Sequence, residues 1–277
     1  MSRRALDPPN APAWSSRTSE HGIVAAMAEK GKGSRGSGGF KSSAGPTFGK
    51  LEQVFEDVWW AWGTTRFMPG VLFPRNMTIV REGGELVVIH PVWMPPAEQT
   101  RIEALGPIKH IVRLGAFHGM DDSHYVKRYA PTVWAPPGVD PHEGVTIHHE
   151  LRPGAELPLA GTLFSFEGSR TPETALHLGR HGGLLLTCDS VQNWETTSGC
   201  SLLGSLMARM MGFRGRACIG PGWRKMCEPK DGRGFAPDFE RLLALDFRHV
   251  IGGHGPPMKD DGKESLRAQV RRIYGIG

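Results

Sequence analysis

Four side chains able to bind metals or transfer protons, His118, Asp121, Asp122 and His124, lie within seven positions of one another. They directly follow the apolar run 108–114, which we expect to be a strand. A loop at the end of a strand holds its side chains at a sheet edge, where a pocket can form. The spacing therefore predicts half of a metal or proton-transfer site. The same residues also fit a polar surface turn whose aspartates cap a helix beginning near Ser123.

Two later motifs also place a metal-binding side chain after an apolar run. Asp189 follows the run 183–187, and His254 lies in Gly-Gly-His-Gly-Pro-Pro, residues 252–257, after a short strand at 249–251. Each motif alone is weak, because aspartate often caps a helix and glycine and proline serve any tight turn. Three such strand ends in one chain indicate a shared site built from imidazole and carboxylate groups.

The elements expected to position these loops are short strands and amphipathic helices. An aromatic strand at 54–62 precedes a hairpin of 77–81 with 85–90, which turns at Gly83-Gly84, and we expect these three strands to be antiparallel neighbours. Further strands are expected at 108–114, 132–135, 145–148, 161–166, 174–178, 183–187 and 249–251. Helices are expected at 97–105, 125–129, 202–211, 235–245 and 263–274.

Composition divides the chain into a tail and one domain. Residues 1–50 are rich in Ser, Gly, Pro and Arg, and we expect them to be disordered. The net charge of +5 arises in this tail, whose eight Lys and Arg residues outnumber its three acidic residues by five. The remaining residues, 51–277, are nearly neutral, so nucleic acid is not an expected partner.

The cysteines and the hydropathy bear on compartment and class. The four cysteines form no Cys-x-x-Cys pair, and no secretory signal is evident, which favours a reducing cytoplasm and excludes a cysteine-based zinc finger. No window approaches the roughly 20 consecutive apolar residues of a membrane span. We therefore expect a cytoplasmic protein with a small-molecule substrate and no membrane partner, and the sequence leaves the oligomeric state open.

The order of these motifs resembles that of the metallo-β-lactamase superfamily over residues 54–274. The loop 118–124 is similar to the family's His-x-His-x-Asp-His motif, with Met120 on its second His and Ser123 on its last. Leu185-Leu-Thr-Cys-Asp189 resembles the strand with the bridging aspartate, and 250–257 matches the last motif. His90 stands where the family usually has Asp. The third His is expected near 168–173, where Ser169 or Arg170 stands instead.

The resemblance implies an α/β (α+β) fold, a four-layer αββα sandwich. Because half of the loop motif is missing, it implies one divalent ion, zinc, iron or manganese, held by His118, Asp122, Asp189 and His254. The reaction implied is hydrolysis of an ester, lactone or phosphoester.

Roles for further residues follow from this hypothesis. Asp121 and Asp122 are the predicted catalytic acids, with Asp121 as the proton shuttle. Arg170 would favour an anionic substrate, and His124 and His177 would orient ligands. The alternative is an inactive protein of the same fold that acts as a binding or scaffold module, with the aspartates as helix caps.

Overall fold

The computed structural model describes residues 47–276, and its largest sheet has seven strands in sequence order. Strands β1 to β4 pair antiparallel, whereas β4 to β7 pair parallel. The predicted antiparallel arrangement of the first strands is therefore confirmed. The strands of this sheet are β1 (Glu52–Phe55), β2 (Val58–Met68), β3 (Val71–Glu82), β4 (Glu85–Ile89), β5 (Ile108–Val112), β6 (Thr132–Ala135) and β7 (His149–Glu150).

A second sheet has four strands in the order β13-β10-β9-β8, and a two-stranded ribbon pairs β11 with β12. Strands β8 (Thr162–Ser165), β9 (Thr174–Leu178) and β10 (Leu184–Thr187) form an antiparallel meander. Strand β13 (His249–Ile251) joins β10 in parallel, so the ends of these two strands lie at the same edge. The ribbon consists of β11 (Gln192–Trp194) and β12 (Gly215–Cys218).

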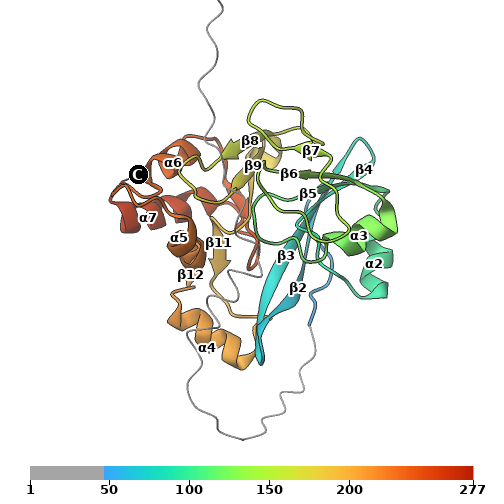
Figure 1. Ribbon diagram of the computed structural model, residues 1–277, viewed down its shortest axis with the longest axis horizontal. Helices are drawn as coiled ribbons and strands as arrows, with labels where there is room; N and C mark the ends of the chain where they lie inside the picture. The colour runs from blue at the N-terminus through green and yellow to red at the C-terminus, as the bar shows by residue number, and fades with distance from the viewer. Residues whose placement is uncertain (1–46, 277) are drawn as a thin grey trace, which may run out of the picture. The chain divides into compact units, whose positions relative to one another are not determined.

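Six α-helices accompany these sheets in the described part of the chain. They are α2 (Pro96–Glu103), α3 (Asp122–Tyr129), α4 (Leu202–Met210), α5 (Pro221–Cys227), α6 (Ala236–Leu243) and α7 (Gly262–Tyr274). Figure 1 shows α2 and α3 beside the first strands of the large sheet, and α5, α6 and α7 together on the other side of the domain.

Alternating side chains of the central strands explain the layers. In β4, Val87 and Ile89 pack between the two sheets, whereas Leu86 and Val88 face a cluster that includes Ile102 of α2. In β10, Leu184 and Leu186 join the core between the sheets, whereas Leu185 packs with Trp223 of α5, Phe239 of α6 and Leu266 of α7. Successive residues of a strand point to opposite faces of the sheet. Strands that are apolar throughout are therefore buried on both faces. The αββα sandwich expected from the sequence is confirmed.

The element predictions differ from the structure in three respects. The aromatic run 54–62 is not one strand, because Asp57 adopts a φ of 59° and turns the chain between β1 and β2. The short strand expected at 145–148 lies instead at His149–Glu150. Strands β11 and β12 and helix α5 were not predicted, because each is short and contains Gly, Pro or polar residues that also suit loops.

Two further sequence predictions concern the N-terminal tail and membrane-spanning segments. The tail predicted for residues 1–50 lies almost wholly outside the described residues. Among the described residues, no helix combines the length and the apolar character that crossing a membrane requires.

Strand β3 connects the two sheets at the edge where the candidate motifs meet. The backbone N–H of Asn76 donates to the carbonyl of Gly253 (2.8 Å). The Asn76 side-chain amide donates to the carbonyls of Gly252 (2.7 Å) and Gly255 (2.5 Å). A residue of the first sheet thus fixes the loop that follows β13 in the second sheet.

Substitution of Leu178 by alanine should destabilise the domain, because this residue of β9 is 0% exposed in the core between the sheets. We expect a loss of about 2–5 kcal/mol in the free energy of unfolding. Leu202→Ala is the matched control, since Leu202 is 91% exposed, and it should change this free energy by less than about 0.5 kcal/mol. Urea denaturation of both variants measures the difference, and equal losses would contradict the packing described above.

Candidate metal centre

Three side chains predicted from the sequence converge at one sheet edge. His118 lies in the loop after β5, Asp189 in the loop after β10, and His254 in the loop after β13. The Nε2 atoms of the two histidines are 3.1 Å apart, and Asp189 Oδ1 lies 3.4 Å from His118 Nε2 and 3.2 Å from His254 Nε2. Among the described residues, these three form the one group whose ligand atoms all lie within 4.8 Å of one another.

The loops that carry these residues pack tightly against each other. The backbone N–H of Gly253 donates to the carbonyl of Cys188 (3.0 Å), which joins the His254 loop to the Asp189 loop. A Cβ atom at Gly253 would lie 2.8 Å from that carbonyl oxygen and 2.9 Å from Cε1 of His118. Only glycine fits at this position, which explains part of the Gly-Gly-His-Gly motif.

A hydrogen bond orients the ring of His254. Its Nδ1 lies 2.6 Å from the carbonyl oxygen of Pro74, which can only accept a hydrogen bond and so favours the tautomer with Nδ1–H. The lone pair of Nε2 is then directed at Asp189 and His118. This arrangement, in which one ring nitrogen is held by a carbonyl and the other is left as a ligand, is common in metal-binding histidines.

The electrostatics favour the ligand forms of these groups. Burial tends to raise the pKa of Asp189, but the neighbouring His118 and His254 outweigh it, so the pKa lies below its ordinary value. Burial lowers the pKa of His118, although Asp189 partly opposes this. Near neutral pH the carboxyl group is therefore ionised and the His118 ring is neutral, as metal binding requires.

A borderline divalent metal fits this donor set. The group offers two imidazole nitrogens and one carboxylate oxygen. Zinc, iron(II) and manganese(II) all bind ligands of these two kinds. An ion bound to all three would also satisfy the buried polar atoms that now face one another. His118, Asp189 and His254 are thus the candidate metal ligands.

Glu173 is a residue of the centre that the sequence analysis missed. Its Oε1 accepts a hydrogen bond from the backbone N–H of Ser190 (2.7 Å), the residue after Asp189. Burial, with the charge of Asp189, raises its pKa well above the ordinary value. Glu173 ends the segment 168–173 where the third His was sought, and a glutamate directly before the strand 174–178 was the available signal.

His90 also belongs to the neighbourhood of the centre. Its ring is buried 5.3 Å from that of His118, and neither ring nitrogen has a hydrogen-bond partner among the described residues. Burial and the nearby His118 lower its pKa well below the ordinary value. A neutral imidazole therefore stands at the end of β4, where the resemblance to metallo-β-lactamases leads one to expect an aspartate.

Asp122 is not brought to the three converging ligands, contrary to the sequence hypothesis. It is buried at the start of α3, and its Oδ2 lies 3.6 Å from Nε of Arg113. A Cβ atom at Gly119 would lie 2.4 Å from Cζ of Arg113, so the guanidinium lies directly under the loop. Asp122 thus lies beside a buried arginine and is not part of the group formed by His118, Asp189 and His254.

Asp121 has two partners of its own. Its Oδ2 accepts hydrogen bonds from Nη2 of Arg75 (2.6 Å) and from the backbone N–H of Trp93 (3.0 Å). These contacts tie the loop to strand β3 and to the segment after β4. The role of Asp121 as a proton shuttle stays a prediction.

The remaining predicted site residues lie apart from the cluster. Arg170 is exposed, and its guanidinium donates to the carbonyl of Met226. His124 lies on α3 and contacts the ring of Tyr125, whereas His177 pairs with the carbonyl of Asp246 (2.7 Å). The structure therefore gives no contact between these three residues and the candidate ligands.

Asp122→Asn should leave metal binding unchanged and should alter the pH dependence of stability. Burial raises the pKa of Asp122 to about 7, from an ordinary value of 3.8. The folded state therefore holds this proton over a range in which the unfolded state releases it, and stability falls as pH rises between these two values. The variant lacks that proton, so its free energy of unfolding should fall less over this range. Parallel urea titrations test this, and identical pH profiles would contradict the shifted pKa.

Comparison with known proteins identifies the fold. No family model and no curated protein matched the sequence. Among solved structures, the mono-zinc form of the metallo-β-lactamase FIM-1 from Pseudomonas aeruginosa is 18% identical, with 82% of this chain and 96% of that chain covered and a TM-score of 0.54. A metallo-β-lactamase from Pontibacter korlensis is 12% identical, with 81% and 99% covered and a TM-score of 0.53.

A third structure, a metallo-β-lactamase from Erythrobacter litoralis with β-mercaptoethanol in its active site, is 14% identical. It covers 80% of this chain and 96% of its own, with a TM-score of 0.54. All three cover at least 80% of this chain at an identity of 18% or less, so the likeness is one of fold. The chain has the fold of the metallo-β-lactamase superfamily.

Proposed function

We propose that this protein is a metal-dependent hydrolase whose single divalent ion is held by His118, Asp189 and His254. The observation that carries the proposal is the convergence of these three ligand atoms at the shared edge of the two sheets. The alternative, a metal-free binding module, does not explain why these three ligand atoms meet. The fold supports the proposal, because the similar solved structures include a metallo-β-lactamase described as a mono-zinc form.

One ion, and not two, is expected because of the partners of the loop acids. Asp121 is paired with Arg75, and Asp122 lies beside Arg113. Two guanidinium groups next to these carboxylates repel a second cation and take the place of its charge. The proposed stoichiometry is therefore one zinc, iron or manganese ion for each chain.

The proposed chemistry is hydrolysis of an ester, lactone or phosphoester. A divalent ion supplies Lewis acidity, which lowers the pKa of a water molecule towards neutrality and polarises a carbonyl or phosphoryl oxygen. The Pro74 carbonyl fixes the ring of His254. Glu173 accepts from the backbone N–H of Ser190 and so holds the backbone beside Asp189. Arg75 adds positive charge near His118 and His90, and Arg113 adds more near His90. This charge, in place of Arg170, is the basis on which we propose an anionic substrate.

Metal content tests the ligand assignment. After anaerobic reconstitution with zinc, iron or manganese, the full chain should retain about one ion of the preferred metal. Asp189→Ala and His254→Ala should reduce the content to background, because each removes one of three ligands. His124→Ala is the matched control and should bind as the wild type does. Elemental analysis measures all four proteins, and a wild-type chain that retains none of the three metals would overturn the proposal in favour of the binding module.

Glu173→Ala should weaken metal binding by about 10- to 100-fold, because it removes the acceptor that holds the backbone beside Asp189. Glu173→Gln should bind nearly normally, because burial and the charge of Asp189 disfavour the ionised form of Glu173, and glutamine keeps a carbonyl oxygen that can accept from Ser190. Competition with a fluorescent chelator measures both affinities. Equal losses in the two variants would show that the charge of Glu173, and not its hydrogen bond, is what matters.

A further inference from the structure

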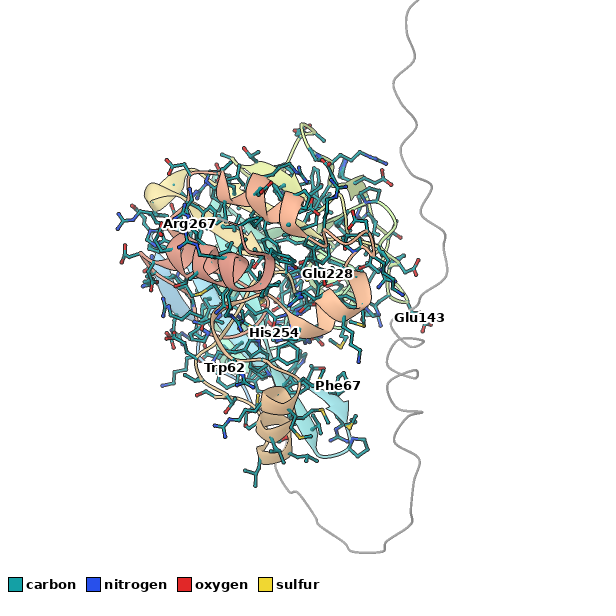
Figure 2. The ribbon with its side chains drawn as sticks, turned by 90° about the vertical axis from the view of Figure 1, so that its left-hand side faces the viewer. Trp62, Phe67, Glu143, Glu228, His254 and Arg267 are labelled. Carbon is teal, nitrogen blue, oxygen red and sulfur yellow. The ribbon has the colours of Figure 1, made fainter. Side chains whose placement is uncertain are left out.

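Helix α4 and the end of the β2–β3 hairpin form one joined unit, here called the lobe and defined as residues 64–73 and 199–214. Ser201 connects them, because its hydroxyl donates to the carbonyl of Gly70 (2.7 Å) and accepts from the backbone N–H groups of Leu72 (3.1 Å) and Gly204 (3.0 Å). A Cβ atom at Gly204 would lie 2.4 Å from the Leu72 carbonyl oxygen, so the helix and the hairpin are in close contact. Figure 2 shows Phe67 of the hairpin beside this helix, with His254 farther into the domain.

The helix presents its large apolar side chains to solvent. Leu202 is 91% exposed, Leu203 49%, Leu206 55% and Met210 80%, whereas its buried residues are the small Gly204 and Ala208. An ordinary surface helix buries its large apolar residues. Of the six large hydrophobic residues that are exposed in the described chain, four belong to this one helix. Such a concentration is typical of an interaction surface.

The lobe is also free of acidic residues. No Asp or Glu occurs in residues 58–81 or 196–227, which contain the two halves of the lobe. Arg66, Arg209 and Arg214 are exposed on it, and none forms an ion pair with an acidic residue of the described chain. By contrast, Arg216, two residues beyond the second segment of the lobe, is paired with Glu195 and Asp261. The lobe therefore carries uncompensated positive charge around an apolar face.

We propose that the lobe docks peripherally on an anionic phospholipid surface. A helix with exposed leucine and methionine on one side and arginines near it suits the boundary between headgroups and acyl chains. Each arginine near an anionic surface adds a favourable attraction that salt weakens. A second copy of the lobe is a poorer occupant, because it would bring like charges together. Peripheral docking needs no spanning segment, so it revises the expectation of no membrane partner that the hydropathy suggested.

Ring contacts connect the lobe to the candidate metal centre. Phe67 contacts Phe73 (5.6 Å between ring centroids), Phe73 contacts Trp194 (6.2 Å), and Trp194 stacks on His254 (5.7 Å). A chain of three ring contacts would therefore link the docked lobe to His254, one of the candidate ligands.

Sedimentation with vesicles tests the proposal on the full chain. Vesicles of phosphatidylcholine with about one third phosphatidylglycerol should bind the protein, and phosphatidylcholine alone should bind it at least about tenfold less. Leu206→Glu with Met210→Glu should reduce binding to the anionic vesicles by about tenfold or more, and Arg209→Gln with Arg214→Gln should reduce both the binding and its salt dependence. Arg152→Gln with Arg248→Gln is the control, because both arginines are exposed and paired elsewhere.

Circular dichroism and unfolding midpoints establish that each variant is folded. Binding that is equal in the lobe variants and the control would overturn the proposal and assign vesicle binding to another part of the chain, such as the basic residues before position 47. Equal binding to neutral and anionic vesicles, or none to either, would also overturn it. Self-association that Leu206→Glu abolishes, without vesicle binding, would instead identify a second copy as the occupant. None of these readouts depends on metal binding or hydrolysis.

Discussion

The contact between strand β3 and the loop after β13 is the constraint on which the candidate centre depends. Asn76 holds three carbonyls of that loop, and the neighbouring Pro74 carbonyl fixes the ring of His254. Between them, Arg75 reaches Asp121 in the loop that carries His118. Three consecutive residues of one strand thus tie together loops that are more than 100 positions apart, and they do so mainly with backbone acceptors, whose positions are set by the sheets.

The centre needs this rigidity because its components repel one another without an ion or a proton between them. Two imidazole rings face each other with Nε2 atoms 3.1 Å apart, and one carboxylate lies beside both. Glycines at the closest approaches, such as Gly253, allow the loops to meet. Buried arginines lie next to Asp121 and Asp122 and add positive charge at this edge, which is why we propose one ion for each chain.

Periodicity and chain order were enough to predict the strands and loops that carry all three candidate ligands. Apolar runs end shortly before His118, Asp189 and His254, in the loops after β5, β10 and β13, and strand ends at one edge bring such residues together. The position of Asp122 beside Arg113 could not be predicted, because no local sequence pattern indicates that Arg113 is buried under Gly119. Glu173 was missed because Thr-Pro-Glu-Thr also suits a turn. Helix α4 was predicted to within one residue. The exposure of its large apolar residues was not predicted, because it depends on the close approach of Gly204 to Leu72.

Anomalous diffraction from crystals of the zinc-reconstituted protein would locate the bound metal. We expect one anomalous peak per chain, at about 2.0–2.2 Å from Nε2 of His118, Nε2 of His254 and a carboxylate oxygen of Asp189. A crystal with no peak there, or a peak held by other residues while these three remain paired with one another, would contradict the assignment of this sheet edge as a metal centre.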